Sequence, residues 1–244
     1  MQNQILHTLR ELKLSGMAIA LQTQWERPLN QDLSFEERLD LILNFELTYR
    51  SDKRIIRLLR DANFNQSARM EDLIYSDSRG ISKSQLLSLF RSDFINAAQD
   101  LLIVGATGCG KSYIAIAIGH NACRKGLKVK YVKLPVYLDE LCISQVNGTY
   151  TKELANLAKA DLVILDDFGL NPLTVKHRHI LFSIIEERHK LKSTIITSQL
   201  PVASWYEYIN DPTIADAIMD RLLEKSHRIE LKGVSMRKPQ KMDY

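Results

Sequence analysis

Apolar residues near the start of the chain recur at the spacing of an α-helix. Between residues 35 and 45 they recur at helical rather than strand spacing: Phe35, Leu39, Ile42, Leu43 and Phe45. Ser34 followed by Glu37 is a capping-box pattern, which marks the start of this helix. We expect residues 1–66 to form a small all-helical domain, which serves either as a structural brace or as a docking module for a partner protein.

The pattern changes in the middle of the chain. Residues 67–99 are largely polar, and we expect them to link the helical domain to a second domain and to begin it. From residue 100, strand-like apolar runs alternate with helical segments, one of which extends from about Lys176 to Leu191; the runs are LLIVG, KVKYVK, DLVILDD and STIITSQ. Strands separated by helices predict an α/β domain over residues 100–244, with a parallel sheet covered by helices on both faces.

Composition and charge are those of an ordinary globular protein. Apolar residues make up 45% of the chain and charged residues 25%. The apolar runs are far shorter than the ~20 residues of a membrane span, and no secretory signal precedes them, so we expect a cytoplasmic protein without a membrane partner. The net charge of +4 permits nucleic-acid binding without indicating it. The three cysteines are far apart and lack clustered histidines, which argues against a disulfide or a zinc site.

The first strand-like run ends in a glycine-rich turn that matches a phosphate-binding loop. The pattern is two glycines with four residues between them, then lysine and a hydroxyl residue, in the order Gly105, Ala106, Thr107, Gly108, Cys109, Gly110, Lys111, Ser112. In such a loop the backbone N–H groups wrap the phosphates, the lysine reaches the β- and γ-phosphates, and the hydroxyl binds Mg²⁺. We expect this loop and the adjoining Tyr113 to bind a nucleotide.

Two carboxylates follow a second apolar run, in LVILDDFG. Asp166 emerges at the carboxyl end of the expected strand, where open α/β sheets bind ligands, and is a candidate ligand of Mg²⁺. Asp167 is a candidate general base that polarises an attacking water. The alternative is a solvated acidic turn. A small-molecule kinase does not need a second carboxylate aimed at water, so the pair favours hydrolysis.

Further polar residues extend the candidate site. Ser198 or Gln199, at the end of STIITSQ, is placed to orient the water or touch the γ-phosphate, although turn chemistry before Pro201 explains them equally well. Lys176 and Arg178 follow the acidic strand end and are candidates for contact with DNA phosphates. A solvated basic face is the alternative for these two residues.

Taken in order, these motifs resemble the AAA+ ATPases, and specifically the IstB-like branch that assists insertion-sequence transposition. The resemblance extends over nearly the whole chain and includes LRELKLSGMA, FEERLDLIL, RLLRDANF, the phosphate loop, LVILDDFG and DRLLEKSHRIELKG. It implies an AAA+ type, three-layer P-loop NTPase fold, with Arg221 as an arginine finger and Arg237 as the second sensor. Asp167 stands where the wider superfamily has Glu, which implies slow hydrolysis, and Ser198 stands where many relatives have Asn.

The resemblance also implies a function. We expect an ATPase that uses ATP and Mg²⁺, assembles as a homo-oligomer with ATP between subunits, and hydrolyses ATP slowly, with stimulation by DNA or a partner. It would bind double-stranded DNA without sequence preference and deliver it to a transposase. Two alternatives share the same motifs: a DnaC-type helicase loader, and an ATP-locked DNA-binding scaffold with negligible turnover.

Overall fold

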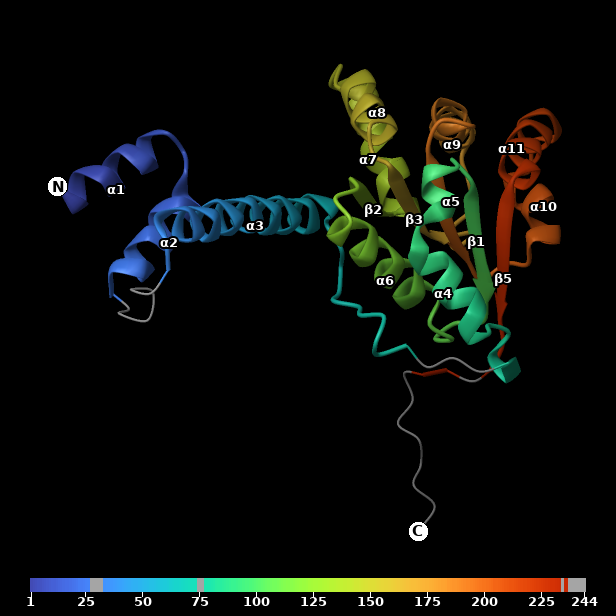
Figure 1. Ribbon diagram of the computed structural model, residues 1–244. Helices are drawn as coiled ribbons and strands as arrows, with labels where there is room; N and C mark the ends of the chain where they lie inside the picture. Colours follow the sequence, from blue (N-terminus) through green and yellow to red (C-terminus); the bar gives the residue numbers. More distant parts are fainter. Residues whose placement is uncertain (27–32, 74–76, 234, 237–244) are drawn as a thin grey trace, which may run out of the picture. The chain divides into compact units, whose positions relative to one another are not determined.

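The chain folds into two compact units, Met1–Arg57 and Leu58–Tyr244. The computed structural model describes residues 1–26, 33–73, 77–233 and 235–236 (Figure 1). Its α-helices are α1 (Gln2–Glu11), α2 (Ser15–Glu26), α3 (Phe35–Ala62), α4 (Lys83–Arg91), α5 (Asp93–Asn96), α6 (Lys111–Arg124), α7 (Leu134–Val146), α8 (Tyr150–Ala158), α9 (Val175–Arg188), α10 (Trp205–Ile209) and α11 (Pro212–Glu224). The strands are β1 (Asp100–Gly105), β2 (Val129–Lys133), β3 (Leu162–Phe168), β4 (Ser193–Ser198) and β5 (Ser226–Leu231), and two short 3₁₀ helices cover Asp77–Arg79 and Val202–Ser204.

The first unit contains α1, α2 and most of α3. The predicted capping box is present at the start of α3: the Ser34 N–H donates to the Glu37 carboxylate at 2.7 Å, and the Glu37 N–H donates to Ser34 Oγ at 3.2 Å. Among the five apolar residues whose spacing predicted this helix, only Ile42 is buried, and Phe35 is 65% exposed. The spacing therefore identified the helix correctly, but most of its apolar side chains face solvent in the isolated chain.

A buried carboxylate fixes α2 against α3. Glu46 is 5% exposed and accepts hydrogen bonds from the Met17 N–H at 2.9 Å and from Arg50 Nε at 2.6 Å. Burial raises the pKa of Glu46, but the hydrogen bonds from Arg50 and Met17 outweigh it and hold that pKa below its usual range. A Cβ on Gly16 would lie 2.7 Å from Glu46 Oε2 and 2.9 Å from Glu46 Cα. The glycine of the SGMA sequence therefore allows the first turn of α2 to approach α3 closely.

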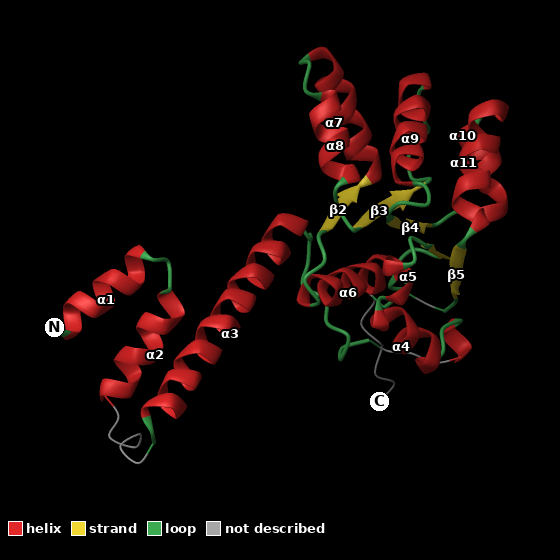
Figure 2. Ribbon diagram, turned by 45° about the horizontal axis from the view of Figure 1, so that its top comes forward, coloured by secondary structure: helices red, strands yellow, loops and turns green. Residues whose placement is uncertain are grey.

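The second unit is a parallel α/β domain of three layers. Its five strands pair in the order β2-β3-β4-β1-β5, and every pairing is parallel. Figure 2 shows the sheet between α4, α5 and α6 on one face and α7 to α11 on the other. The strands are continuous apolar runs because both faces are buried: Leu101 and Ile103 of β1 pack on the side of α6, and Leu102 and Val104 pack on the opposite side.

The second unit begins earlier than the sequence pattern indicated. Leu58 and Ala62, in the last turns of α3, belong to the core cluster on the α6 side of the sheet. Residues 67–99 contain α4 and α5, whose Phe90 and Phe94 enter the same cluster. The strand β5, which no apolar run predicted, completes the sheet beside β1.

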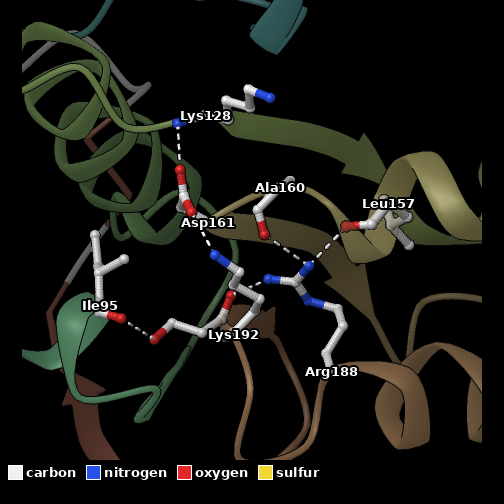
Figure 3. Close-up of polar contacts among 8 residues, drawn as sticks. Ile95, Lys128, Leu157, Ala160, Asp161, Arg188 and Lys192 are labelled. Atoms are coloured by element: carbon white, nitrogen blue, oxygen red, sulfur yellow. Dashed lines mark hydrogen bonds and ion pairs between the residues drawn. The ribbon is translucent and has the colours of Figure 1, made fainter.

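Buried polar groups form hydrogen bonds at the end of the sheet where the central strands β3 and β4 begin (Figure 3). Arg188, 1% exposed, donates through Nη1 to the carbonyls of Leu157 and Ala160 at 2.7 and 3.0 Å. Asp161 accepts from the Lys128 N–H at 2.9 Å and from Lys192 Nζ at 2.6 Å. Burial lowers the pKa of Arg188 to about 10, still far above neutrality, so this buried guanidinium remains charged.

All three cysteines are free thiols. Cys109 and Cys123 are buried, and Cys142 on α7 is partly exposed. Burial raises the pKa of Cys123 to about 12. Over the described part of the chain, the helices are too short or too polar to cross a membrane.

Candidate functional site

The predicted phosphate loop connects β1 to α6. Gly108 and Gly110 adopt φ values of +82° and +97°, which L-residues with a side chain rarely tolerate. A Cβ on Gly108 would also lie 2.2 Å from Ser235 Oγ. Because α6 begins at Lys111, the positive end of the helix dipole lies at the loop. The loop therefore has the backbone conformation and the helix terminus that favour bound phosphate.

Lys111 is 7% exposed and lies within the loop. Its ammonium donates to the carbonyls of Gly105 at 2.8 Å and Ala106 at 2.9 Å. A cleft of about 640 Å³ opens beside it, and the two candidate carboxylates, Asp166 and Asp167, line this cleft together with the loop. The positive charge, the helix terminus and the two carboxylates thus meet at one cleft.

Asp166 lies at the centre of a hydrogen-bond network and is 2% exposed. Ser112 Oγ donates to its Oδ1 at 2.7 Å, and the Thr197 hydroxyl also donates to Oδ1. The Tyr131 hydroxyl donates to Oδ2 at 2.6 Å. The first turn of α6, β2 and β4 therefore each contribute one hydroxyl group that holds this carboxylate.

A bulge in β3 places Asp167 beside Asp166. The pairing with β4 is regular up to Leu165 and resumes at Phe168, so one extra residue is accommodated between them. Asp167 adopts φ of +64°, and its N–H donates to Thr197 Oγ1 at 3.2 Å. Without the bulge, strand alternation would direct the two carboxylates to opposite faces of the sheet. With it, both line the cleft.

The oxygen atoms around Asp166 fit Mg²⁺. This ion prefers oxygen ligands and is usually held by one or two carboxylates together with waters and substrate phosphates. Ser112 Oγ and Asp166 Oδ1, 2.7 Å apart, provide a hydroxyl and a carboxylate oxygen beside the phosphate loop. Among the residues that the structure describes, no group of three or more His, Cys, Asp or Glu side chains forms a metal cage. Ser112 and Asp166 would hold the ion jointly with the nucleotide.

The structure distinguishes Ser198 from Gln199. Ser198 is fully buried; its Oγ donates to the Phe168 carbonyl at 2.7 Å and accepts from the Leu200 N–H at 3.0 Å. Its side chain is therefore engaged on the far side of the strand from the cleft. Gln199 lines the cleft and accepts a hydrogen bond from Thr107 Oγ1 at 2.7 Å. Of the two residues, Gln199 has the position expected for contact with the γ-phosphate or the water.

The two arginines implied by the family resemblance lie apart from these residues. Arg221, on α11, forms an ion pair with Glu186 of α9 and donates through Nη1 to the Ala217 carbonyl at 2.8 Å. It is not among the residues that line the cleft of its own chain. Arg237 lies outside the described residues. The Met236 N–H, just before it, donates to the Gly108 carbonyl at 2.9 Å.

The candidate DNA contacts lie in the first turn of α9. Lys176 is exposed, whereas Arg178 is partly buried. The Arg178 guanidinium donates to the Leu173 carbonyl at 3.4 Å, and its Nε is buried without a hydrogen-bond partner among the described residues. The structure therefore leaves Lys176 available to a DNA backbone and directs part of Arg178 toward its own domain.

Sequence reasoning did not identify three residues of the site. Tyr131 and Thr197 hold Asp166, and Arg79 lines the cleft and donates to the Cys109 carbonyl at 2.7 Å. Thr197 was predictable, because it lies one residue before Ser198 and therefore points to the opposite face of β4. No sequence pattern identified Tyr131 or Arg79 as a site residue, since each lies far from the motifs in sequence.

Comparison with known proteins covers almost the whole chain. The family model described as IstB-like ATP binding protein matches residues 7–243. The insertion-sequence ATP-binding protein y4pL of Sinorhizobium fredii (strain NBRC 101917 / NGR234) is 40% identical over 236 residues, which make up 97% of this chain and 96% of that protein.

Solved structures share the fold. The crystal structure of DnaI is 21% identical, with a TM-score of 0.58 over 74% of this chain and 93% of that chain. The crystal structure of the DnaC helicase loader is 22% identical, with a TM-score of 0.52 over 71% of this chain and 98% of that chain. The fold is thus that of a P-loop NTPase of the AAA+ type, as the sequence predicted. The match along the chain and the intact phosphate loop lead to one conclusion: the protein belongs to the family of IstB-like ATP-binding proteins of insertion sequences.

Proposed function

We propose that this chain is a Mg²⁺-dependent ATPase that assembles on double-stranded DNA without sequence preference and delivers that DNA to a transposase. The proposal rests above all on the arrangement of Lys111, Ser112, Asp166 and Asp167 around one cleft. Family membership gives ATP binding and the insertion-sequence context. ATP hydrolysis, DNA binding and delivery of DNA to a transposase are the proposed additions to what family membership gives.

The positions of the carboxylates support hydrolysis. Asp166 is held by three hydroxyl groups, which suits a fixed ligand of a metal ion. Asp167 has moved out of the regular strand at the bulge and lines the cleft, which suits a base that reaches a water. Gln199, bonded to Thr107 of the loop, would orient that water or contact the γ-phosphate. Mg²⁺ would neutralise the phosphate charge when bound.

The position of Arg221 supports assembly through ATP. It is 24% exposed and does not line its own cleft, so a role in catalysis requires the cleft of another subunit. The ion pair between Arg221 and Glu186 would have to break before the guanidinium could contact the nucleotide of a neighbouring subunit. Binding of ATP and assembly would then stabilise each other, because each completes a site that the other needs.

The first unit is proposed to be the partner-docking domain. It exposes Leu12, Phe35, Leu47 and Ile56 by more than 60% each. Exposed apolar side chains support this proposal, because large apolar patches on soluble proteins mark interaction sites. In a chain of the insertion-sequence family, a transposase is the partner that the context favours.

The DnaC likeness is one of fold alone, so it does not separate a helicase loader from a transposition protein. Pull-down of the full chain against the transposase of the same insertion sequence and against a replicative helicase separates the two. An ATP-locked scaffold would bind DNA with ATP but would show negligible single-turnover hydrolysis.

Sedimentation of the full chain with ATP, ADP and duplex DNA in all combinations tests the proposal. We expect larger species with ATP and DNA than with ADP and DNA, for two unrelated DNA sequences. Lys111→Ala should abolish the ATP effect, because it removes the ammonium that binds the β- and γ-phosphates. Lys125→Ala is a control, since that ammonium donates to the Phe90 and Arg91 carbonyls away from the loop. Equal species sizes in every nucleotide state would contradict the proposed coupling.

A further inference from the structure

The end of α3 leads directly to the site through a segment that has no role so far. Asn63, the last residue of RLLRDAN, adopts φ of +58° and ends the helix, and the segment begins at Phe64. The Phe64 ring stacks on His120 of α6, with 4.4 Å between ring centroids. A Cβ on Gly119 would lie 2.8 Å from Phe64 Cε1, so a glycine is needed where the ring meets the helix. The segment is therefore held firmly on α6 just before Asn65.

Asn65 begins a chain of hydrogen bonds that ends on the candidate metal ligand. Asn65 Nδ2 donates to the Tyr131 hydroxyl at 2.7 Å, and that hydroxyl donates to Asp166 Oδ2 at 2.6 Å. Tyr131 is 3% exposed, in the middle of β2. A tyrosine has one hydroxyl proton, and a carboxylate accepts it more strongly than an amide oxygen. The amide of Asn65 consequently presents its N–H₂ group to the tyrosine oxygen.

The two oxygens of Asp166 are held from different directions. Oδ1 accepts from Ser112 and Thr197, and Oδ2 accepts from Tyr131. If Ser112 turns its oxygen toward Mg²⁺, its hydrogen bond to Oδ1 weakens, whereas the bond from Tyr131 to Oδ2 is unaffected. Partners of this kind around metal ligands set metal affinity by fixing the orientation of the ligand.

We propose that Tyr131, oriented by Asn65, is a positioning residue for Asp166, and that the segment after α3 thereby sets the Mg²⁺ affinity of the nucleotide site. The proposal rests on the proposed role of Asp166 as a ligand of Mg²⁺. It assigns a function to the residues that follow RLLRDAN, which take no part in the phosphate loop.

Equilibrium binding of a fluorescent ATP analogue to the full chain, titrated with Mg²⁺, tests this proposal. Tyr131→Phe removes one hydroxyl and should raise the half-saturating Mg²⁺ concentration about tenfold. Asn65→Leu keeps the shape but loses the donor, and should raise it by a smaller factor. Nucleotide affinity in EDTA should stay unchanged in both variants. Tyr137→Phe makes the same change in a tyrosine buried on the opposite side of the sheet, and should have no effect.

The double variant is the sharper measurement. If Asn65 acts through Tyr131, the double variant should match Tyr131→Phe alone, because the second change then removes nothing further. If the increases in half-saturating Mg²⁺ concentration of the two single variants multiply in the double variant, Asn65 acts independently of Tyr131, and the proposal is overturned. Unchanged Mg²⁺ dependence in Tyr131→Phe would overturn it as well. If Tyr131→Phe fails to fold, as thermal melting would show, an unchanged Asn65→Leu protein overturns the proposal and a raised value supports it.

The wild-type titration separates this proposal from the proposed function. Wild-type binding that requires Mg²⁺, with variants that behave identically, overturns the relay and leaves the function intact. Wild-type nucleotide binding that is indifferent to Mg²⁺ removes the assignment of Asp166 as a metal ligand, and the relay with it.

Discussion

Asp167 occupies a backbone conformation that few residues adopt. Its φ of +64° lies in the left-handed region, which Gly, Asn and Asp tolerate best. Asn therefore keeps both the shape and the backbone of the bulge while removing the proton acceptor. We expect Asp167→Asn to bind ATP normally and to hydrolyse it at least ~100-fold more slowly in single-turnover assays.

The control for this variant is Asp93→Asn, which makes the same change at an exposed position of α5. It should hydrolyse ATP like the wild type. Loss of ATP binding in Asp167→Asn would contradict its role as a base and would show that this carboxylate holds the metal or the fold.

Asp100 should make stability depend on pH. Burial raises its pKa from 3.8 to about 6, although the Thr194 N–H and Arg188 oppose this shift. Because the folded state binds the proton more tightly than the unfolded state, Asp100 lowers the free energy of unfolding as pH rises from about 4 to 6. The loss is at most roughly 3 kcal/mol and is complete above that range.

Urea unfolding of wild type and Asp100→Asn between pH 4 and 7 measures this effect. The asparagine oxygen can still accept from Thr194, and the variant cannot ionise. The difference in unfolding free energy between the two proteins should therefore change across pH 4 to 6 in favour of the variant. A constant difference over that range would show that Asp100 does not titrate there.

At the scale of single residues, the sequence predicts where a side chain lies when a motif fixes its position. Lys111 and Ser112 of the phosphate loop and Asp166 of LVILDDFG all line one cleft. Ser198 does not line the cleft, because strand alternation directs its side chain to the face of β4 opposite that of Thr197, which contacts Asp166. Tyr131 was beyond prediction, since only the sheet brings β2 beside β3.

Among the elements, the α2–α3 contact depends on one glycine. A methyl group at position 16 would meet the Glu46 carboxylate, the Glu46 Cα and the Tyr49 Cβ at 2.7 to 2.9 Å. Backbone atoms cannot give way as a flexible side chain can. We expect Gly16→Ala to destabilise the first unit by about 1–3 kcal/mol. Amide hydrogen exchange measures this, because it reports α1 to α3 separately from the ATPase unit.

Ile19→Ala serves as the comparison, since Ile19 is 43% exposed on the same helix. It should leave exchange in α1 to α3 nearly unchanged. Equal protection in the Gly16→Ala protein would mean that α2 can move away from α3 without loss.

Three of the four strands that the sequence predicted share a physical property. The runs that form β1, β3 and β4 are apolar on both sides, because helices cover both faces of the sheet. β5 is an edge strand, and His227, Arg228 and Glu230 are exposed, so its sequence has no apolar run to reveal it. The end of the first unit at Arg57 gave no signal either, since it falls inside the continuous helix α3.

For the whole molecule, the central question is whether Arg221 acts on a second subunit. Arg221→Ala keeps an intact phosphate loop, and Lys111→Ala keeps an intact arginine. A mixture of the two should hydrolyse more ATP than either alone, because one interface then combines a working loop with a working arginine. ATPase measurements on the mixture, after co-assembly has been shown by affinity tagging of one variant, provide the test.

Co-assembly without recovered activity would contradict action in trans. Glu186→Gln is an informative companion, because it releases Arg221 from its ion pair while leaving the guanidinium in place. If that pair competes with the neighbouring nucleotide, this variant should assemble at lower ATP concentrations than the wild type.

The unequal burial of the three thiols provides a site for selective chemical labelling of the unmodified sequence. Maleimide reagents attack the thiolate at an accessible surface, and only Cys142, on α7, is partly exposed, whereas Cys109 and Cys123 are enclosed. A fluorophore should therefore enter one position without any cysteine being removed. Energy transfer between donor- and acceptor-labelled chains would then follow subunit exchange in real time, with the phosphate loop unmodified.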